Sequence, residues 1–141
     1  MDSDYGLYVW PSAIVLSHYL YHEHYNSLRD KVVLELGSGT SLVGLLASAL
    51  GAKVTLTDRA DAPQLMSHIK TIISINEPLF IVHKPTLIGF NWGDFNLEIM
   101  YHVPIPDIIL GADILYDEEG KSVCIAISSL MFKILRMCLL V

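Results

Sequence analysis

Two acidic residues and a pair of glycines are the positions in this 141-residue chain whose types and spacing best suit ligand binding. Glu35 stands just before Gly37 and Gly39, and Asp58 follows further along the chain. Glycines let a backbone turn sharply and approach a ligand closely. An acidic side chain at the end of the next strand is placed to accept hydrogen bonds from ribose hydroxyls. Together these residues indicate a site for a nucleoside.

The same residues distinguish among nucleoside ligands. No Lys follows the glycines as it does in a phosphate-binding G-x-x-x-x-G-K-[ST] loop, and Leu42 stands where the dinucleotide pattern G-x-G-x-x-G has its third glycine. Two carboxylates beside the turn would repel a pyrophosphate. They favour a cationic nucleoside without phosphate, such as S-adenosylmethionine. The alternative interpretation is a turn whose glycines and acids serve packing alone.

Strands and helices alternate around these positions. Strands are predicted at residues 31–36, 53–57, 80–90 and 107–112, the third of them at a sheet edge because Pro85 interrupts it. Helices are predicted from Pro11, at 42–49 with Thr40 or Ser41 as cap, at 61–76 and from about 119, and residues 123–141 are interpreted as an amphipathic helix. This order is typical of an α/β fold with a Rossmann-like, doubly wound, mostly parallel sheet.

Composition restricts the class of protein. Hydrophobic residues make up 52% of the chain and charged residues 17%, so disorder is excluded and residues 1–141 are interpreted as a single domain. A net charge of -6 argues against direct nucleic-acid binding, and Lys133 and Arg136 argue against a membrane span. Two cysteines and no secretory signal favour a cytoplasmic or nuclear protein. His18 and His22 have helical spacing but no third ligand, so no metal is expected.

Three further segments complete a set of motifs. They are Trp10-Pro11 before the first helix, Asn91-Trp92-Gly93 after the third strand, and Asp113 to Tyr116 after the fourth. With the Glu-Leu-Gly-Ser-Gly run, they resemble the seven-strand, class I S-adenosylmethionine-dependent methyltransferases, and among these the lysine methyltransferase-like family (family sixteen). The resemblance covers about residues 5–118.

The resemblance implies roles for the matched positions, with S-adenosylmethionine as the cofactor. Asp113 and Tyr116 would face the acceptor amine as catalytic residues. Ser41 departs from the pattern, since family members tend to have a third glycine there. The residues expected to bind the cofactor are Trp10, Glu35, Gly37, Ser38, Gly39, Asp58, Trp92 and Ala112.

The activity implied is transfer of a methyl group to a lysine or arginine side chain of a protein. The substrate would be a basic protein segment, with histones as candidates. The family at large favours lysine as the acceptor, and one subgroup makes arginine in histone tails the alternative acceptor. The chain stops soon after the fourth strand, so we expect a shortened class I sheet that lacks the later strands and leaves the fourth strand as an exposed edge. The alternative function is that of a shortened, non-catalytic form that acts as an interaction partner or has no activity. The sequence does not indicate an oligomeric state.

Overall fold

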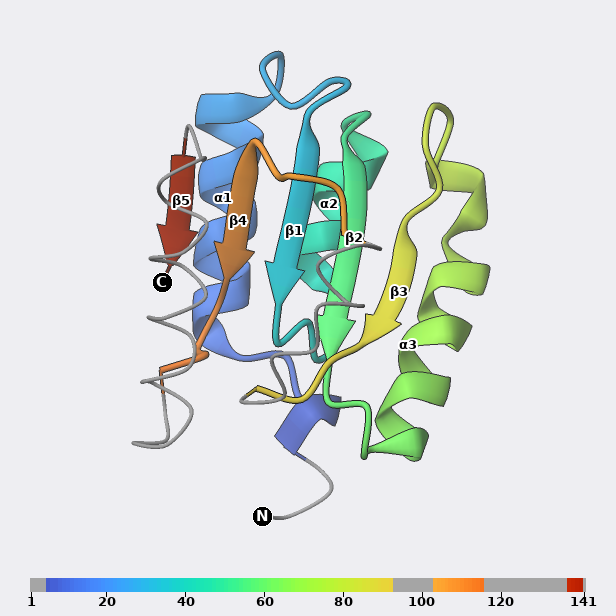
Figure 1. The fold of residues 1–141 in the computed structure, drawn as a ribbon. Helices are drawn as coiled ribbons and strands as arrows, with labels where there is room; N and C mark the ends of the chain where they lie inside the picture. Colours follow the sequence, from blue (N-terminus) through green and yellow to red (C-terminus); the bar gives the residue numbers. More distant parts are fainter. Residues whose placement is uncertain (1–4, 93–102, 116–136, 141) are drawn as a thin grey trace.

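The computed structural model describes residues 5–92, 103–115 and 137–140. Within these residues the chain forms one parallel sheet with helices against it (Figure 1). The strands are β1 (Val32–Leu36), β2 (Lys53–Asp58), β3 (Thr86–Gly89), β4 (Ile108–Gly111) and β5 (Met137–Leu140). The helices are α1 (Pro11–His24), α2 (Leu42–Ala49) and α3 (Pro63–Ile75), with short 3-10 turns η1 (Tyr5–Leu7) and η2 (Glu77–Leu79).

The strand order is β3-β2-β1-β4-β5, and every neighbouring pair is parallel. The chain moves outward from β1 through β2 to β3 and then returns to the other side of β1 as β4. Ligands of such sheets bind beyond the carboxyl ends of the strands, where the strand order reverses. The predicted Rossmann-like parallel α/β fold is confirmed, and its topology directs attention to the carboxyl ends of β1, β2 and β4.

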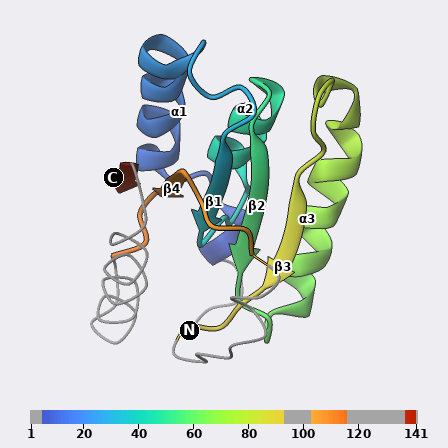
Figure 2. The ribbon, with the colours of Figure 1, turned by 45° about the horizontal axis from the view of Figure 1, so that its top comes forward.

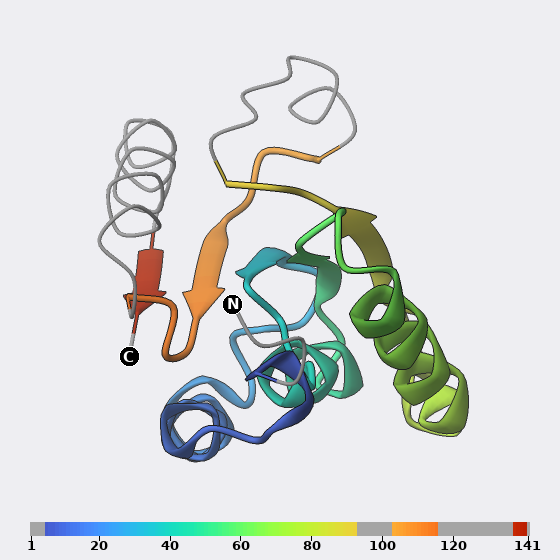
Figure 3. The same cartoon turned by 90° about the horizontal axis from the view of Figure 1, so that it is seen from below.

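The three helices lie on one face of the sheet (Figure 3). α1 packs against α2, and α3 lies alongside β3 (Figure 2). Because side chains alternate across a strand, β1 sends Val33 into the core beneath the helices, while Leu34 and Leu36 join a second cluster on the opposite face. The strand is therefore buried on both faces, as its continuous apolar run predicts.

The first and third helices agree with their sequence patterns. Pro11 occupies the first turn of α1, where a missing N–H costs nothing, and Leu16 and Leu20 are fully buried. In α3, Leu65, Ile69 and Ile73 face the core. Among the described residues, none of the helices combines the length and hydropathy that crossing a membrane requires.

The second helix forms where it was expected but buries a different face. The apolar repeat that predicts it runs through its leucines, yet Leu42 is exposed, whereas Val43, Gly44 and Ala47 are buried. A Cβ on Gly44 would collide with the Glu35 carboxylate and with the Leu56 side chain. The small residues face the sheet because α2 lies too close to β1 and β2 for larger ones.

The carboxyl-terminal strand corrects two expectations. Residues 137–140 are the strand β5, not part of an amphipathic helix, and β5 pairs with β4, so β4 is not an edge. The polar residues that suggested a helical stripe all precede this segment and lie outside the described residues. Residues 137–140 are uniformly apolar, and so short a run cannot be assigned to a helix or a strand by periodicity. The helix predicted from about residue 119 also lies outside the described residues.

Candidate functional site

The turn after β1 depends on glycine at two positions. Gly37 and Gly39 have φ values of 58° and 49°, in the left-handed region that residues with a Cβ rarely adopt. Space is restricted as well, since a Cβ on Gly37 would lie 2.9 Å from Ile114 Cγ2 and 3.3 Å from the Trp92 ring. The turn can pass beneath these two side chains only because it carries none at that point.

Ser38, between the two glycines, ties the turn to β2. Its backbone N–H donates to the Thr57 carbonyl at 2.9 Å, and its hydroxyl donates to the same oxygen and accepts from the Thr57 N–H, both at 3.1 Å. The Thr57 hydroxyl in turn donates to the Glu35 carbonyl at 2.7 Å. The hydroxyl of Ser38, a predicted cofactor ligand, is thus engaged with the neighbouring strand.

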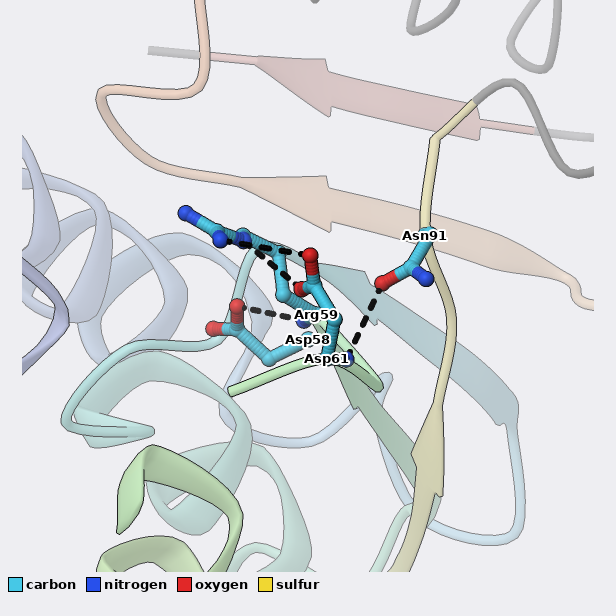
Figure 4. Close-up of polar contacts among 4 residues, drawn as sticks. All are labelled: Asp58, Arg59, Asp61 and Asn91. Atoms are coloured by element: carbon cyan, nitrogen blue, oxygen red, sulfur yellow. Dashed lines mark hydrogen bonds and ion pairs between the residues drawn. The ribbon is translucent and has the colours of Figure 1, made fainter. Parts of the chain in front are cut away.

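Asp58 reaches from the end of β2 to the same turn. Its Oδ2 accepts a hydrogen bond from the Gly39 N–H at 2.7 Å. Its Oδ1 accepts one from the Arg59 N–H at 2.8 Å, which Figure 4 shows. The side chain is largely buried, and this burial raises the pKa of its carboxyl, against the opposing effect of the two N–H donors. A carboxylate has lone pairs beyond these two bonds, so Asp58 can still accept hydrogen bonds from a ligand.

Glu35 lies deeper than Asp58. It is 3% exposed, and its Oε2 accepts a hydrogen bond from the Gly44 N–H of α2 at 3.2 Å. Burial raises the pKa of its carboxyl from its usual value of about 4.5 to about 8, and the negative charge of Asp58 adds to the effect. The two predicted acids therefore lie at the same end of the sheet, but Glu35 is mostly uncharged near neutral pH and is held under the first turn of α2.

Ser41 differs from the capping residue that the sequence suggested. It precedes α2 with a φ of 59°, and its hydroxyl makes no capping bond to the helix. Gly44, whose N–H a capping serine would ordinarily bind, donates to Glu35 instead. The Ser41 hydroxyl is fully buried without a hydrogen-bond partner among the described residues, so the side chain does not stabilise α2 in the expected way.

Sequence reasoning missed a polar cluster beyond β2 and β3. Arg59 Nε donates to Asp61 Oδ1 at 3.0 Å, and the Asp61 N–H donates to the side-chain oxygen of Asn91 at 3.3 Å (Figure 4). The Arg59 guanidinium holds the pKa of the Asp61 carboxyl below its usual range. The sequence signal for this cluster was position: Arg59 follows β2 directly, Asn91 stands two residues after β3, and the carboxyl ends of these two paired strands lie side by side.

The two tryptophans occupy different places. Trp92 lies against Gly37 and packs on the cluster opposite the helices. Trp10 precedes α1 and packs edge-on against Tyr8, with ring centroids 5.3 Å apart. Ala112 is half-buried beside the core on the helix face.

Asp113 contacts the start of α1. Its Oδ2 accepts a hydrogen bond from the Ser12 N–H at 3.2 Å. Tyr116, the second predicted catalytic residue, lies outside the described residues, as does Gly93 of the Asn-Trp-Gly motif. The structure thus gathers the glycine turn, Asp58, Glu35 and Trp92 at one end of the sheet, with Asp113 linking that end to α1.

Curated relatives of this chain are protein methyltransferases. It is 43% identical over 119 residues to histone-arginine methyltransferase METTL23 of Xenopus laevis, a match that covers 84% of this chain and 48% of the relative. It is 34% identical to the human METTL23 over 128 residues, or 90% of this chain and 64% of the relative. Protein N-lysine methyltransferase METTL21A of Xenopus tropicalis is 41% identical over 111 residues, or 79% of this chain and 48% of the relative. The chain spans about half the length of the first of these relatives.

Solved structures share the fold. Magnesium protoporphyrin IX methyltransferase (ChlM) from Synechocystis PCC 6803, in a structure with bound S-adenosylmethionine, superposes with a TM-score of 0.61 at 17% identity over 84% of this chain and 52% of that one. A S-adenosylmethionine-dependent methyltransferase from Agrobacterium tumefaciens gives 0.58 at 25% identity over 74% of this chain and 32% of that one. The likeness to ChlM supports the fold alone.

The family model described as lysine methyltransferase matches residues 1–134, which is nearly the whole chain. The sequence motifs indicated a resemblance to this family and, within it, to METTL23; they are Glu-Leu-Gly-Ser-Gly, Trp-Pro, Asn-Trp-Gly and Asp-x-x-Tyr. The comparisons confirm this resemblance. The chain belongs to the lysine methyltransferase family.

Proposed function

We propose that this chain carries the cofactor site of a S-adenosylmethionine-dependent protein methyltransferase whose acceptor is a lysine or arginine side chain. The observation that carries the proposal is the bond between Asp58, at the end of β2, and Gly39, in the turn after β1. It puts an acidic acceptor and a glycine turn together beside the point where the strand order reverses.

The residues at this end of the sheet fit such a cofactor. Asp58 offers carboxylate lone pairs to ribose hydroxyls, and Gly37 and Gly39 add no side chain of their own to the turn. The ring of Trp92 beside Gly37 is an apolar face, and an aromatic face near a cation contributes about 0.5–2 kcal/mol. When bound, S-adenosylmethionine supplies a methyl group on a positively charged sulfur.

The protein's part in methyl transfer is mainly positioning, because the transfer is an in-line displacement that needs no covalent enzyme intermediate. The attacking nitrogen must be uncharged, so the acceptor must be held where water is scarce. Asp113 and Tyr116 are the residues we assign to the acceptor side. A basic protein segment suits the chain's net charge of -6. The relatives are named histone-arginine and protein N-lysine methyltransferases, so arginine in histones and lysine both stay candidates for the acceptor. We propose that the protein acts in the cytoplasm or nucleus, where such substrates occur.

Calorimetric titration with S-adenosylhomocysteine tests the cofactor site. The wild-type chain should bind, and Asp58→Ala should weaken binding at least tenfold, since a hydrogen bond to a charged group contributes about 1.5–3 kcal/mol. Glu77→Ala is the matched control. Glu77 is an exposed acid paired with Lys84, and it follows α3 at the opposite end of the sheet (Figure 1), so its loss should leave the affinity unchanged. Circular dichroism would verify that both variants stay folded.

The result separates the enzyme from its alternative. If the folded wild-type chain releases no heat at high concentration, the cofactor site is refuted and a non-catalytic interaction partner is favoured. If binding occurs but Asp58→Ala keeps full affinity, the assignment of Asp58 to the ribose is wrong. Incubation with labelled methyl donor and two histone-tail peptides, one with only lysine and one with only arginine as acceptor, would then decide the substrate.

A further inference from the structure

The first turn of α1 has no cap from its own sequence neighbours. Trp10 precedes the helix, and its side chain makes no capping bond. Pro11, in the first turn, has no N–H to satisfy. The N–H of Ser12 is therefore the first donor of the helix, and helix geometry gives it no acceptor within the helix.

Asp113, which is distant from Ser12 in the sequence, supplies that acceptor. Its Oδ2 lies 3.2 Å from the Ser12 nitrogen, across a separation of 101 residues. A carboxylate at the amino end of a helix is also favoured by the helix dipole. Asp113 has a φ of 54°, a left-handed conformation that aspartate and asparagine tolerate better than most residues. Asp113 thus combines a left-handed backbone conformation after β4 with a hydrogen bond to the start of α1.

The residue after Asp113 contacts the turn described above. Ile114 is 3% exposed, and its Cγ2 would lie 2.9 Å from a Cβ placed on Gly37. Two consecutive residues behind β4 therefore hold two different parts of the molecule: Asp113 holds the start of α1, and Ile114 covers the glycine turn after β1.

The chain between these parts is fixed at both ends. Gly6 lies over the same turn, with its carbonyl oxygen 3.4 Å from the position of a Cβ on Gly39. From Gly6 the chain runs through Trp10 to Ser12, where Asp113 holds it. Releasing Ser12 would free one end of the segment whose other end packs against the turn.

We propose that Asp113 is a positioning residue: through the Ser12 N–H it anchors the segment from Gly6 to Ser12 against the glycine turn, and so supports cofactor binding as well as the acceptor side. The effect on affinity rests on the proposed function, whereas the anchor itself does not. A purely catalytic Asp113 would touch only the acceptor, and its loss would leave the cofactor affinity unchanged.

Three substitutions separate the possible roles of the side chain. Asp113→Asn keeps a side-chain oxygen and tolerates the left-handed backbone, but removes the charge. Asp113→Gly accepts the backbone conformation and removes the oxygen. Asp113→Ala removes the oxygen and also strains the backbone, because alanine disfavours a positive φ. A comparison of the glycine and alanine variants therefore separates the lost bond from backbone strain.

Amide hydrogen exchange measured by NMR reads out the anchor directly. Exchange at the Ser12 amide should accelerate at least tenfold in Asp113→Gly and Asp113→Ala, and should stay within about threefold of wild type in Asp113→Asn. The amide of Leu20, in the interior of α1, is the internal control, since general destabilisation would accelerate it as well. If the Ser12 exchange rate is the same in Asp113→Gly and wild type, the anchor is overturned.

Titration with S-adenosylhomocysteine reads out the consequence. The dissociation constant should rise at least fivefold in Asp113→Gly and return to within about twofold of wild type in Asp113→Asn. If Asp113→Gly frees the Ser12 amide yet binds with wild-type affinity, the anchor does not support the cofactor site and the proposal is overturned. If the wild-type chain does not bind, the proposed function fails together with this consequence, while the exchange rates still decide whether Asp113 holds α1.

Discussion

Replacing Glu35 by glutamine should make the stability of this chain less dependent on pH. Glu35 is buried beneath α2, and its Oε2 accepts the Gly44 N–H at 3.2 Å. Burial raises the pKa of this carboxyl from about 4.5 to about 8. Glutamine has nearly the same shape, and its amide oxygen can accept the same hydrogen bond, but it does not ionise.

The sign of the effect follows from linkage between ionisation and folding. A carboxyl with a raised pKa in the folded state binds its proton more tightly there than in the unfolded chain. Its contribution to stability is fully present below the unfolded pKa and is lost as the pH rises through the folded pKa. For Glu35 that window runs from about pH 4.5 to about 8.

The magnitude follows from the size of the pKa change. One pKa unit corresponds to about 1.4 kcal/mol, so the whole change is worth roughly 5 kcal/mol, of which about 4 kcal/mol falls between about pH 5 and pH 9. Domains are stable by only about 5–15 kcal/mol, so this is a large fraction of the total. The glutamine variant should lie within about 2 kcal/mol of wild type near pH 5, because its extra amide hydrogen has to find a partner.

Urea denaturation followed by circular dichroism, repeated at steps of pH, measures this difference. The free energy of unfolding of Glu35→Gln minus that of wild type should increase by several kcal/mol between about pH 5 and pH 9. Glu77→Gln is the matched control, because Glu77 is an exposed acid paired with Lys84 at the surface, and its difference from wild type should change far less than that of Glu35→Gln. A flat difference for Glu35→Gln as well would refute the reasoning, since it would mean that Glu35 is ionised in the folded chain throughout this range.

Two further substitutions test the packing at the start of α2. Gly44→Ala should destabilise the chain by about 2 kcal/mol or more in the same urea assay, because a Cβ there collides with Glu35 and Leu56. A neutral or stabilising result would contradict the close approach of α2 to β1 and β2. Ser41→Gly should stabilise the chain by about 1–3 kcal/mol, since glycine accepts the positive φ and removes a buried hydroxyl without a partner. Ser17→Ala is the comparison, because Ser17 carries the only other buried hydroxyl without a partner among the described residues and lies in helical backbone. Its gain in stability should be smaller than that of Ser41→Gly. A loss of stability in Ser41→Gly would indicate that Ser41 is needed structurally.

Local patterns in the sequence determined much of this fold. Turn residues and apolar periodicity predicted α1, α3, β1, β2 and β4 to within a few residues, because these signals act between near neighbours along the chain. Glycines and an acid at two strand ends also indicated the candidate site, since parallel strands bring their carboxyl ends to one edge. The four apolar residues of β5 carried no such signal, and only pairing with β4 decided that they form a strand.

The chemistry of individual side chains was decided by the tertiary structure. The sequence placed Glu35 beside the turn, but only the close packing of α2 at Gly44 buries it and shifts its pKa. Asp113 was recognised as part of a motif, whereas its bond to Ser12 spans 101 residues. Burial and long-range contacts depend on how distant segments meet in space, and no local pattern of residue types contains that information. The sequence therefore determined which residues gather at the end of the sheet, and the tertiary structure decided which of them are free to meet a ligand and which hold the site together.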